Sequence, residues 1–335
     1  MQEHGMKSAT IRRLLRNRLN KWLDTIADQP TKELLKNNTI VSGGCITSML
    51  IGDKVNDYDL YFRTKEAALA AARYYVKIFN ETVHLKSKVG ANRTPEVREI
   101  KITNIKGVTE ERIVVWMQSA GVAAADEEKA YEYFESSEEG AAEDFVAGMD
   151  GDPEDAMDLA ESLTTPDPDT GVVFKQKSQF NPVFFTDNAI SLTGKMQLVI
   201  RFYGEPDKIH ENYDFAHAMC YYDLRDNKLH LPAEAMECML SKTLIYKGSL
   251  YPIASLFRIR KFVQRGWRIT AGQMLKIIFQ LQGVDLKNRS ILREQLIGVD
   301  QAFMTQLLRE LEKDDKNVQQ IDGMYLAQLI DRIFE

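Results

Sequence analysis

The sequence predicts an α+β fold in two parts, a sheet-containing domain over residues 1–230 and an all-helical domain over residues 231–335. Strand-like and helical runs alternate before residue 230, whereas helical spacing dominates from Pro232 almost to the end. At 335 residues, the chain is long enough for one large or two medium cores. Its 44% hydrophobic and 27% charged residues are typical of a globular protein, and no apolar run is long enough for a membrane span.

The elements of the first domain follow from two periodicities. Residues 6–27 carry apolar side chains at helical spacing opposite an Arg/Lys/Asn face, and residues 65–79 are rich in alanine. Further short helices are predicted over 32–36 and 45–51. Strands are predicted where β-branched and aromatic residues alternate or cluster: 39–41, 57–62, 97–105, 112–117, 172–175, 182–185, 189–192, 195–202 and 215–222. Together they predict a mixed sheet flanked by helices.

Charge is distributed unevenly along the chain. The net charge of -6, from 43 basic and 49 acidic residues, by itself argues against a phosphate-rich partner. Residues 126–169, however, hold 17 acidic residues and one basic residue, so that the rest of the chain carries +10. This acidic segment belongs to an insertion at about 119–170. It can be a solvated loop, an intramolecular mimic of nucleic acid that covers a basic groove, or a docking site for a basic protein partner.

One stretch carries the chemistry. Val41-Ser42-Gly43-Gly44 is followed, after twelve residues, by Asp57-Tyr58-Asp59. Side chains two apart in a strand share a face, so both carboxylates should point at one place. Two hard oxygen ligands suit Mg²⁺, which shares its shell with substrate phosphates. The glycines let backbone N–H groups approach a phosphate, and Ser42 and Ser48 could add hydroxyl donors.

These residues resemble the hG[GS]-x(9–13)-DhD signature of the DNA polymerase β-like nucleotidyltransferase superfamily, where h is apolar. Gly43-Gly44 and Asp57-Tyr58-Asp59 match it, while Ser42 departs from the apolar position. The resemblance implies two-metal transfer from an NTP to a hydroxyl group with Mg²⁺ or Mn²⁺. Asp57 and Asp59 would hold the metals, and Ser42, Gly43, Gly44 and Ser48 would seat the triphosphate.

The superfamily usually has a third carboxylate on a later strand. Asp214 is the predicted third catalytic and metal-binding residue, because it opens the strand-like run after Tyr213. Asp187 and Glu99 are weaker alternatives. The strand over 195–202 contains Gln197 and Arg201 but no acid. If that strand occupies the third-carboxylate position, the protein departs from the superfamily and catalysis is in question.

Two later stretches are similar to tRNA CCA-adding-type enzymes: the Asp-Phe block at Asp214-Phe215, and a basic helix within residues 255–267. The predicted phosphate or nucleic-acid contacts of this helix are Arg258, Arg260, Lys261 and Arg265. The alternative is a solvated basic face of a bundle helix. The resemblance favours RNA, particularly a tRNA-like 3′ end, as the acceptor, although a protein or small molecule is open as well.

The expected function is therefore a Mg²⁺-dependent nucleotidyltransferase. The alternative is a catalytically silent member of the same fold that acts in binding or assembly. The three scattered cysteines, Cys45, Cys220 and Cys238, favour a reducing, cytoplasmic compartment.

Overall fold

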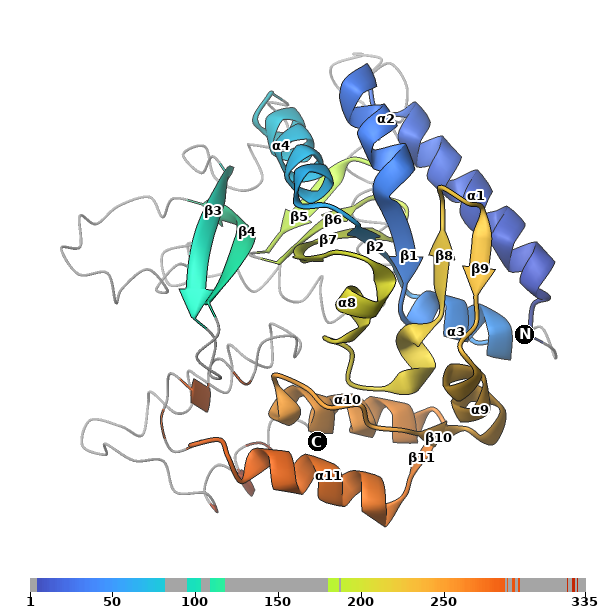
Figure 1. Ribbon diagram of the computed structural model, residues 1–335, viewed down its shortest axis with the longest axis vertical. Coiled ribbons are helices and arrows are strands. Elements are labelled where there is room, and N and C mark those ends of the chain that lie inside the picture. The colour runs from blue at the N-terminus through green and yellow to red at the C-terminus, as the bar shows by residue number, and fades with distance from the viewer. Residues whose placement is uncertain are drawn as a thin grey trace, which may run out of the picture. The chain divides into compact units, whose positions relative to one another are not determined.

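The computed structural model describes residues 5–81, 95–103, 109–117, 180–186 and 188–286, together with positions 288, 291, 292, 295, 324, 327, 328 and 330 (Figure 1). The chain divides into two compact units. The first comprises residues 1–209 and 220–230, and the second comprises residues 210–219 and 231–335. The sequence did not predict that residues 210–219 belong with the C-terminal unit.

The first unit contains a seven-stranded sheet. Its helices are α1 (Ser8–Asp24), α2 (Gln29–Asn38), α3 (Gly44–Ile51), α4 (Lys65–Glu81) and α8 (Pro206–His210). The sheet strands are β1 (Thr39–Ser42), β2 (Tyr58–Phe62), β5 (Pro182–Phe185), β6 (Ala189–Leu192), β7 (Met196–Tyr203), β8 (Tyr221–Asp223) and β9 (Lys228–His230). A separate antiparallel hairpin consists of β3 (Pro95–Thr103) and β4 (Thr109–Met117).

The strand order in the sheet is β5-β6-β7-β2-β1-β8-β9. β2 and β7 pair in parallel, whereas the other neighbours are antiparallel. The predicted mixed sheet flanked by helices is thus confirmed. At its centre, β1 and β2, which are close in sequence, lie beside β7 from a distant part of the chain (Figure 1).

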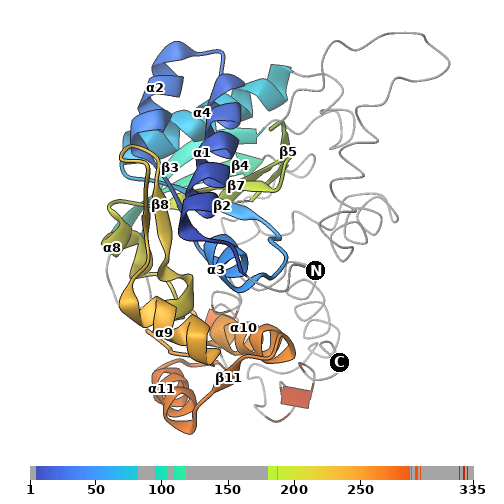
Figure 2. The same cartoon turned by 90° about the vertical axis from the view of Figure 1, so that its right-hand side faces the viewer.

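Helices α1, α2 and α4 gather against one face of this sheet (Figures 1 and 2). α1 buries Trp22, whose indole N–H donates to the Tyr75 hydroxyl of α4 at 2.7 Å. α4 in turn contacts the sheet through Phe79, whose ring meets that of Phe185 edge-on at 5.1 Å. The row of side chains next to Phe185 on this face, namely Ile190, Leu198 and Leu60, is fully buried. Apolar burial therefore defines the covered face of the sheet.

A buried ion pair ties the end of β2 to β8. The guanidinium of Arg63 contacts the carboxylates of both Asp223 and Glu205. The side chains of Arg63 and Asp223 are 5% and 4% exposed, whereas Glu205 is 68% exposed. Arg63 and Asp223 are therefore both shielded from water. Removal of either side chain would leave the other as a buried, unpaired charge.

The second unit is mainly helical. It contains the 3₁₀ helix η3 (Ala216–Met219) and helices α9 (Ala233–Ser241), α10 (Pro252–Gln264) and α11 (Ala271–Leu281). The all-helical prediction missed one feature here, a short parallel pair of β10 (Thr243–Leu244) and β11 (Arg268–Ile269). Gly266, with φ +80°, ends the α10 region in a conformation that favours glycine.

The strand predicted over 215–222 is wrong for most of its length. Residues 216–219 form η3, and only Tyr221–Asp223 pair with the sheet as β8. Phe215 instead forms a bridge with Tyr246, and the Ala216 N–H donates to the Ile245 carbonyl at 3.0 Å. Apolar burial in the second unit therefore prevails over local strand propensity.

Several predictions fall outside the described residues. These are the acidic segment 126–169, most of the insertion at about 119–170, the strand at 172–175, Asp187 and most of the chain after residue 286. Among the described residues, no helix is both long and apolar enough to cross a membrane.

Candidate functional site

The glycine turn connects β1 to α3. β1 is buried throughout, and Gly43 follows it with φ +100° and ψ -159°, a backbone conformation that glycine adopts without strain. Gly43 caps α3 without a side-chain hydrogen bond, which leaves N–H groups of the first turn unsatisfied by a capping side chain. A Cβ atom on Gly44 would meet nothing within 4 Å. The helix therefore begins at an open position suited to an anion.

The two aspartates lie at the start of β2. Asp57 immediately precedes the strand and is exposed, whereas Asp59 lies within it and is half-buried. Asp59 pairs in register with Ser42, the last residue of β1 before the glycine turn. Side chains at positions 57 and 59 of an extended chain project from the same face. The sheet register thus brings the aspartate pair beside the glycine turn.

The electrostatics of the pair agree with this placement. Burial raises the pKa of Asp59 well above its usual range, and the charge of Asp57 adds to the effect. Burial also raises the pKa of the Cys45 thiol, with further contributions from Asp59 and Asp57. Cys45 lies in the first turn of α3, so both carboxylates are close to the start of that helix. The site concentrates negative charge that a bound cation would neutralise.

The two serines predicted at the site differ in their surroundings. Ser42 is buried, and its hydroxyl donates to the Cys220 carbonyl at 3.1 Å. Its side chain thereby helps to join β1 to the segment that leads into β8. Ser48 is half-buried in α3, and its carbonyl accepts from the Asp53 N–H at 2.8 Å. Ser42 is thus engaged within the sheet, and the backbone of the glycine turn is the better placed phosphate donor.

Gln197 is the residue that sequence reasoning did not assign to the site. It stands in register with Asp59 in the parallel β2–β7 pair, and Ser191 of β6 follows it in the next register position. Side chains at adjacent register positions share a face of the sheet. In β7, Met196 and Leu198 are buried, whereas Gln197 between them is half-buried. The strand beside the aspartates therefore carries an amide and no acid. This is the departure from the superfamily pattern that the sequence of residues 195–202 indicated.

Asp214, the predicted third carboxylate, lies in a different unit from the two aspartates. It belongs to the second unit, where its side chain is 4% exposed, accepts from the Ser255 hydroxyl at 2.9 Å and pairs with Arg258. Its carboxylate is thus engaged by two side chains of α10, and its role as the third carboxylate stays a prediction. Glu99, a weaker alternative, lies on β3 and forms an ion pair with Lys65 at 2.7 Å. Asp187 lies outside the described residues.

The predicted basic helix exists as α10, but its cations differ in their surroundings. Arg258 forms an ion pair with the buried carboxylate of Asp214, while its side chain stays 37% exposed. Arg260 and Lys261 are exposed on α10, and Arg265 is exposed at its C-terminal cap. All four residues remain predicted phosphate or nucleic-acid contacts.

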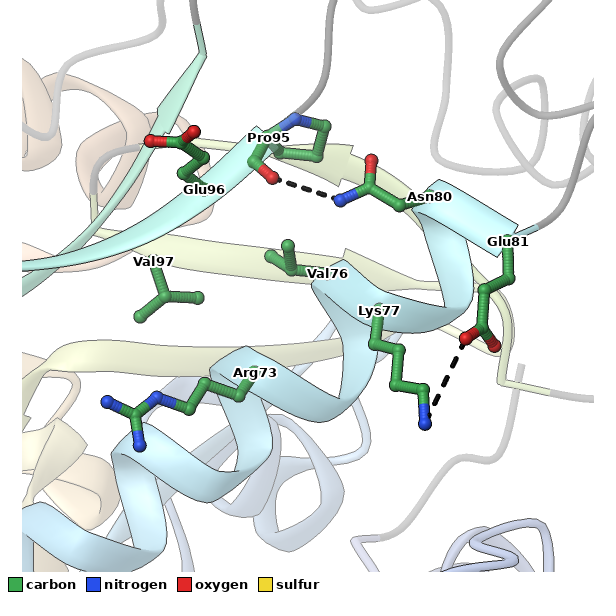
Figure 3. A pocket seen from close by; sticks show the side chains of 8 residues that line it. All are labelled: Arg73, Val76, Lys77, Asn80, Glu81, Pro95, Glu96 and Val97. Carbon is green, nitrogen blue, oxygen red and sulfur yellow. Dashed lines mark hydrogen bonds and ion pairs between the residues drawn. The ribbon is translucent and has the colours of Figure 1, made fainter.

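A separate surface hollow of about 510 Å³ lies between α4 and β3 (Figure 3). Asn80 donates to the Pro95 carbonyl at 3.1 Å on one side of it, and Lys77 and Glu81 form an ion pair on the other. The lining contains neither the glycine turn nor the aspartates. This hollow is therefore distinct from the candidate site.

Comparisons with known proteins supply the family. Among solved structures, the chain is similar to the Thermotoga maritima CCA-adding enzyme complexed with tRNA, with 12% identity and a TM-score of 0.34. The similarity covers 88% of this chain and 53% of that chain, so this chain spans about half the length of that enzyme. No curated protein sequence matches significantly. A family model described as Gabija anti-defense 2 family protein matches residues 13–242, well over half of the chain, and includes the glycine turn and both aspartates. The chain belongs to the Gabija anti-defense 2 family.

Proposed function

We propose that the protein is a Mg²⁺-dependent nucleotidyltransferase that transfers a nucleoside monophosphate from an NTP to a hydroxyl group. The observation that carries the proposal is the register of β1 and β2, which sets Asp57 and Asp59 beside the glycine turn and the start of α3. Carboxylates for a cation and backbone N–H groups for a triphosphate thereby meet at one edge of the sheet.

The residues present fit a divalent cation. Burial and the neighbouring charge of Asp57 raise the pKa of Asp59, so that a cation bound between the carboxylates would relieve both effects. Among the described residues, no cluster of three or more His, Cys, Asp or Glu side chains could hold a metal. Water and substrate phosphates would therefore complete the shell, as is usual for Mg²⁺. When bound, Mg²⁺ or Mn²⁺ would lower the pKa of the attacking hydroxyl and offset charge on the phosphates.

The protein's own groups would then act mainly by positioning. The N–H groups at the start of α3 would hold the triphosphate, and the absence of a Cβ at Gly43 and Gly44 would let it approach the backbone. The acceptor oxygen would form a bond to the α-phosphorus, its proton would pass to water, and the bond to the leaving pyrophosphate would break.

The family supplies a biological setting for the proposal. We propose that the transfer counteracts the Gabija defence named in the family description, and that it takes place in the cytoplasm. RNA with a tRNA-like 3′ end is the proposed acceptor. Arg260, Lys261 and Arg265 are proposed to contact it, since exposed cations suit phosphates.

The test is a transfer assay with a matched inactive variant. Purified full-length protein is incubated with Mg²⁺ or Mn²⁺, each α-labelled NTP and bulk RNA. The wild type should label an acceptor with one NTP, and Asp57→Asn/Asp59→Asn should reduce transfer at least about 100-fold, as expected for the loss of metal-binding groups. Transfer that survives the double substitution would refute the assigned ligands. In cells that carry the Gabija defence, expression of the wild-type protein should abolish that defence, whereas expression of the double variant should not.

A second candidate function is favoured by Gln197. With an amide where a third carboxylate is expected, the site could bind an NTP without transferring it, and the protein would act as a binding or assembly module. NTP binding by calorimetry together with no transfer from any NTP would favour this alternative. Transfer that depends on Asp57 and Asp59 would exclude it.

A further inference from the structure

A second surface hollow, of about 560 Å³, runs along the exposed side of α1 in the first unit. We call it the arginine groove and define it by the arginine and asparagine residues that line it: Arg12, Arg13, Arg16, Asn17, Asn20 and Asn227. The five helical positions recur at intervals of three and four residues, so they form one face of α1. Asn227 comes from the turn between β8 and β9. Among the described residues, none that lines the groove is acidic.

The cations of the groove are exposed, and none of them pairs with a carboxylate of the residues that the structure describes. Arg12, Arg13 and Arg16 are all exposed, and within the described part of the chain no carboxylate lies at ion-pair distance from any of them. Arg63 and Arg258 contrast with them, because each is neutralised by a buried aspartate. The opposite face of α1 is buried in the core, so the backbone positions from which the three arginines project are fixed.

The wall opposite α1 supplies further donors. The buried Tyr222 donates its hydroxyl to Oδ1 of Asn227 at 2.9 Å, an arrangement that leaves the amide nitrogen of Asn227 as the donor. Burial raises the pKa of Tyr222 to about 12, and the charges of Arg16 and Arg12 oppose that rise. Both guanidinium groups are therefore close to this wall. The groove thus combines guanidinium and amide donors, and no described residue that lines it carries a negative charge.

We propose that the arginine groove binds the phosphodiester backbone of a nucleic acid. Arg12 and Arg16 are one helical turn apart, about 6 Å along the axis, and the polar face extends about 12 Å to Asn20. That length exceeds a single phosphate and suits a strand that passes along the helix. Guanidinium groups match phosphate geometry. None of the described residues that line the groove is aromatic, which favours recognition of the backbone over stacking of bases.

This proposal goes beyond nucleotidyl transfer and does not depend on it, because none of the groove residues belongs to the aspartate site. The test uses the full-length protein and the triple variant Arg12→Gln/Arg13→Gln/Arg16→Gln. Fluorescence anisotropy measures binding of a fluorescein-labelled single-stranded RNA and of a labelled duplex DNA across a salt series. The variant should lose at least about 10-fold in affinity at low salt, and for RNA its salt slope should fall by about 2, as expected for three lost phosphate contacts.

The matched control is Lys36→Gln/Arg73→Gln/Lys77→Gln, which removes the same charge from exposed helix positions elsewhere in the first unit. It should change affinity less than about 3-fold, because it removes only long-range attraction. Equal losses in the two triple variants would overturn the assignment to the groove, as would unchanged binding in the arginine variant. Displacement of RNA by polyglutamate as readily as by unlabelled RNA would show an acidic-protein site instead.

A further variant separates this proposal from nucleotidyl transfer. On the Asp57→Asn/Asp59→Asn background, which should have lost transfer, the three arginine substitutions should lower RNA affinity by the same factor as they do in the otherwise wild-type protein. If the arginine substitutions have no effect on this background, the nucleic acid is held through the aspartate site and the groove is refuted.

Discussion

Gln197 of β7 lies in register with Asp59 of β2, across the parallel strand pair in the sheet. The Asp59 carboxylate of the proposed metal site therefore has an amide as its neighbour on the same face. The nucleotidyltransferase superfamily that the motif resembles usually has an acid on a later strand. An amide oxygen can ligate Mg²⁺ without adding negative charge, which limits the repulsion that Asp57 and Asp59 already exert on each other.

Gln197→Glu should increase affinity for divalent cations. A third carboxylate beside Asp59 adds roughly 1 kcal/mol of attraction to a cation at a half-buried site, about 5-fold in affinity. Calorimetric titration with Mn²⁺ measures it. The neutral control Gln197→Met should show no such increase. Unchanged cation affinity in a correctly folded Gln197→Glu variant would mean that this side chain does not reach the aspartates.

Asp59→Asn should stabilise the metal-free protein at neutral pH. The pKa of Asp59 lies above its unfolded value of about 3.9, so the folded state binds more protons between the two values and stability falls as pH rises through that window. The variant should melt at a higher temperature in EDTA at pH 7, and the difference should shrink towards pH 4. Mg²⁺ should stabilise the wild type but not the variant. The exposed Asp53→Asn should behave like the wild type, and a less stable Asp59→Asn would contradict the argument.

Asp214→Asn should lower stability rather than catalysis. The substitution weakens the contacts with Arg258 and Ser255, at a cost of about 1–3 kcal/mol in the free energy of unfolding. Label transfer by the folded variant should stay within a few-fold of the wild type. Urea titration and the transfer assay are read together. A variant with normal stability and no transfer would instead support a catalytic role for Asp214.

Arg63→Met should be strongly destabilising. It leaves the Asp223 carboxylate buried without its partner, which costs about 3–5 kcal/mol as judged from comparable buried pairs. Urea unfolding measures the loss. The double variant Arg63→Met/Asp223→Leu should recover much of it, because no buried charge remains. Glu205→Gln should cost less than about 1 kcal/mol, since Glu205 is exposed. A small loss of stability in Arg63→Met would show that water reaches the Asp223 carboxylate in the folded protein.

His217 should make the second unit sensitive to mild acid. Burial against Phe262 and Trp267 lowers its pKa to about 4, whereas the unfolded residue titrates near 6.5. Below pH 6.5 the unfolded state binds more protons, so stability should fall as the pH drops towards 4, by up to about 3 kcal/mol. Urea unfolding across this range measures the slope. His217→Gln should flatten it, and an equal slope in both proteins would locate the acid sensitivity elsewhere.

Residues close together in sequence account for most of what could be predicted. The strands that contain Val41 and Asp59 and the helices over 6–27 and 65–79 follow from local periodicity, and the structure contains all of them. The spacing of Gly43, Gly44, Asp57 and Asp59 sufficed to propose a site, because a turn and a strand separated by twelve residues have few ways to meet.

The strand prediction over 215–222 failed because the conformation of these residues depends on partners that are remote in sequence. Strand propensity in residues 215–222 could not show that Phe215 would bridge to Tyr246 and that Asp214 would pair with Arg258. The arginine groove likewise requires Asn227, in the turn between β8 and β9, to lie beside α1, although more than 200 residues of sequence separate the two. Local patterns specify which face of an element is apolar, but they do not specify which element covers it.

The sequence alone therefore determined the glycine turn, the aspartate pair and the mixed sheet flanked by helices, because these depend on backbone preference and on side-chain alternation over short stretches. Only the tertiary structure decided that β7 rather than residues 215–222 lies beside Asp59, so that Gln197 occupies the adjacent position. The physical reason is that strand order depends on the burial of whole faces. Leu60, Leu198 and Ile190 form one buried row, and the same register sets Asp59 next to Gln197 on the opposite face.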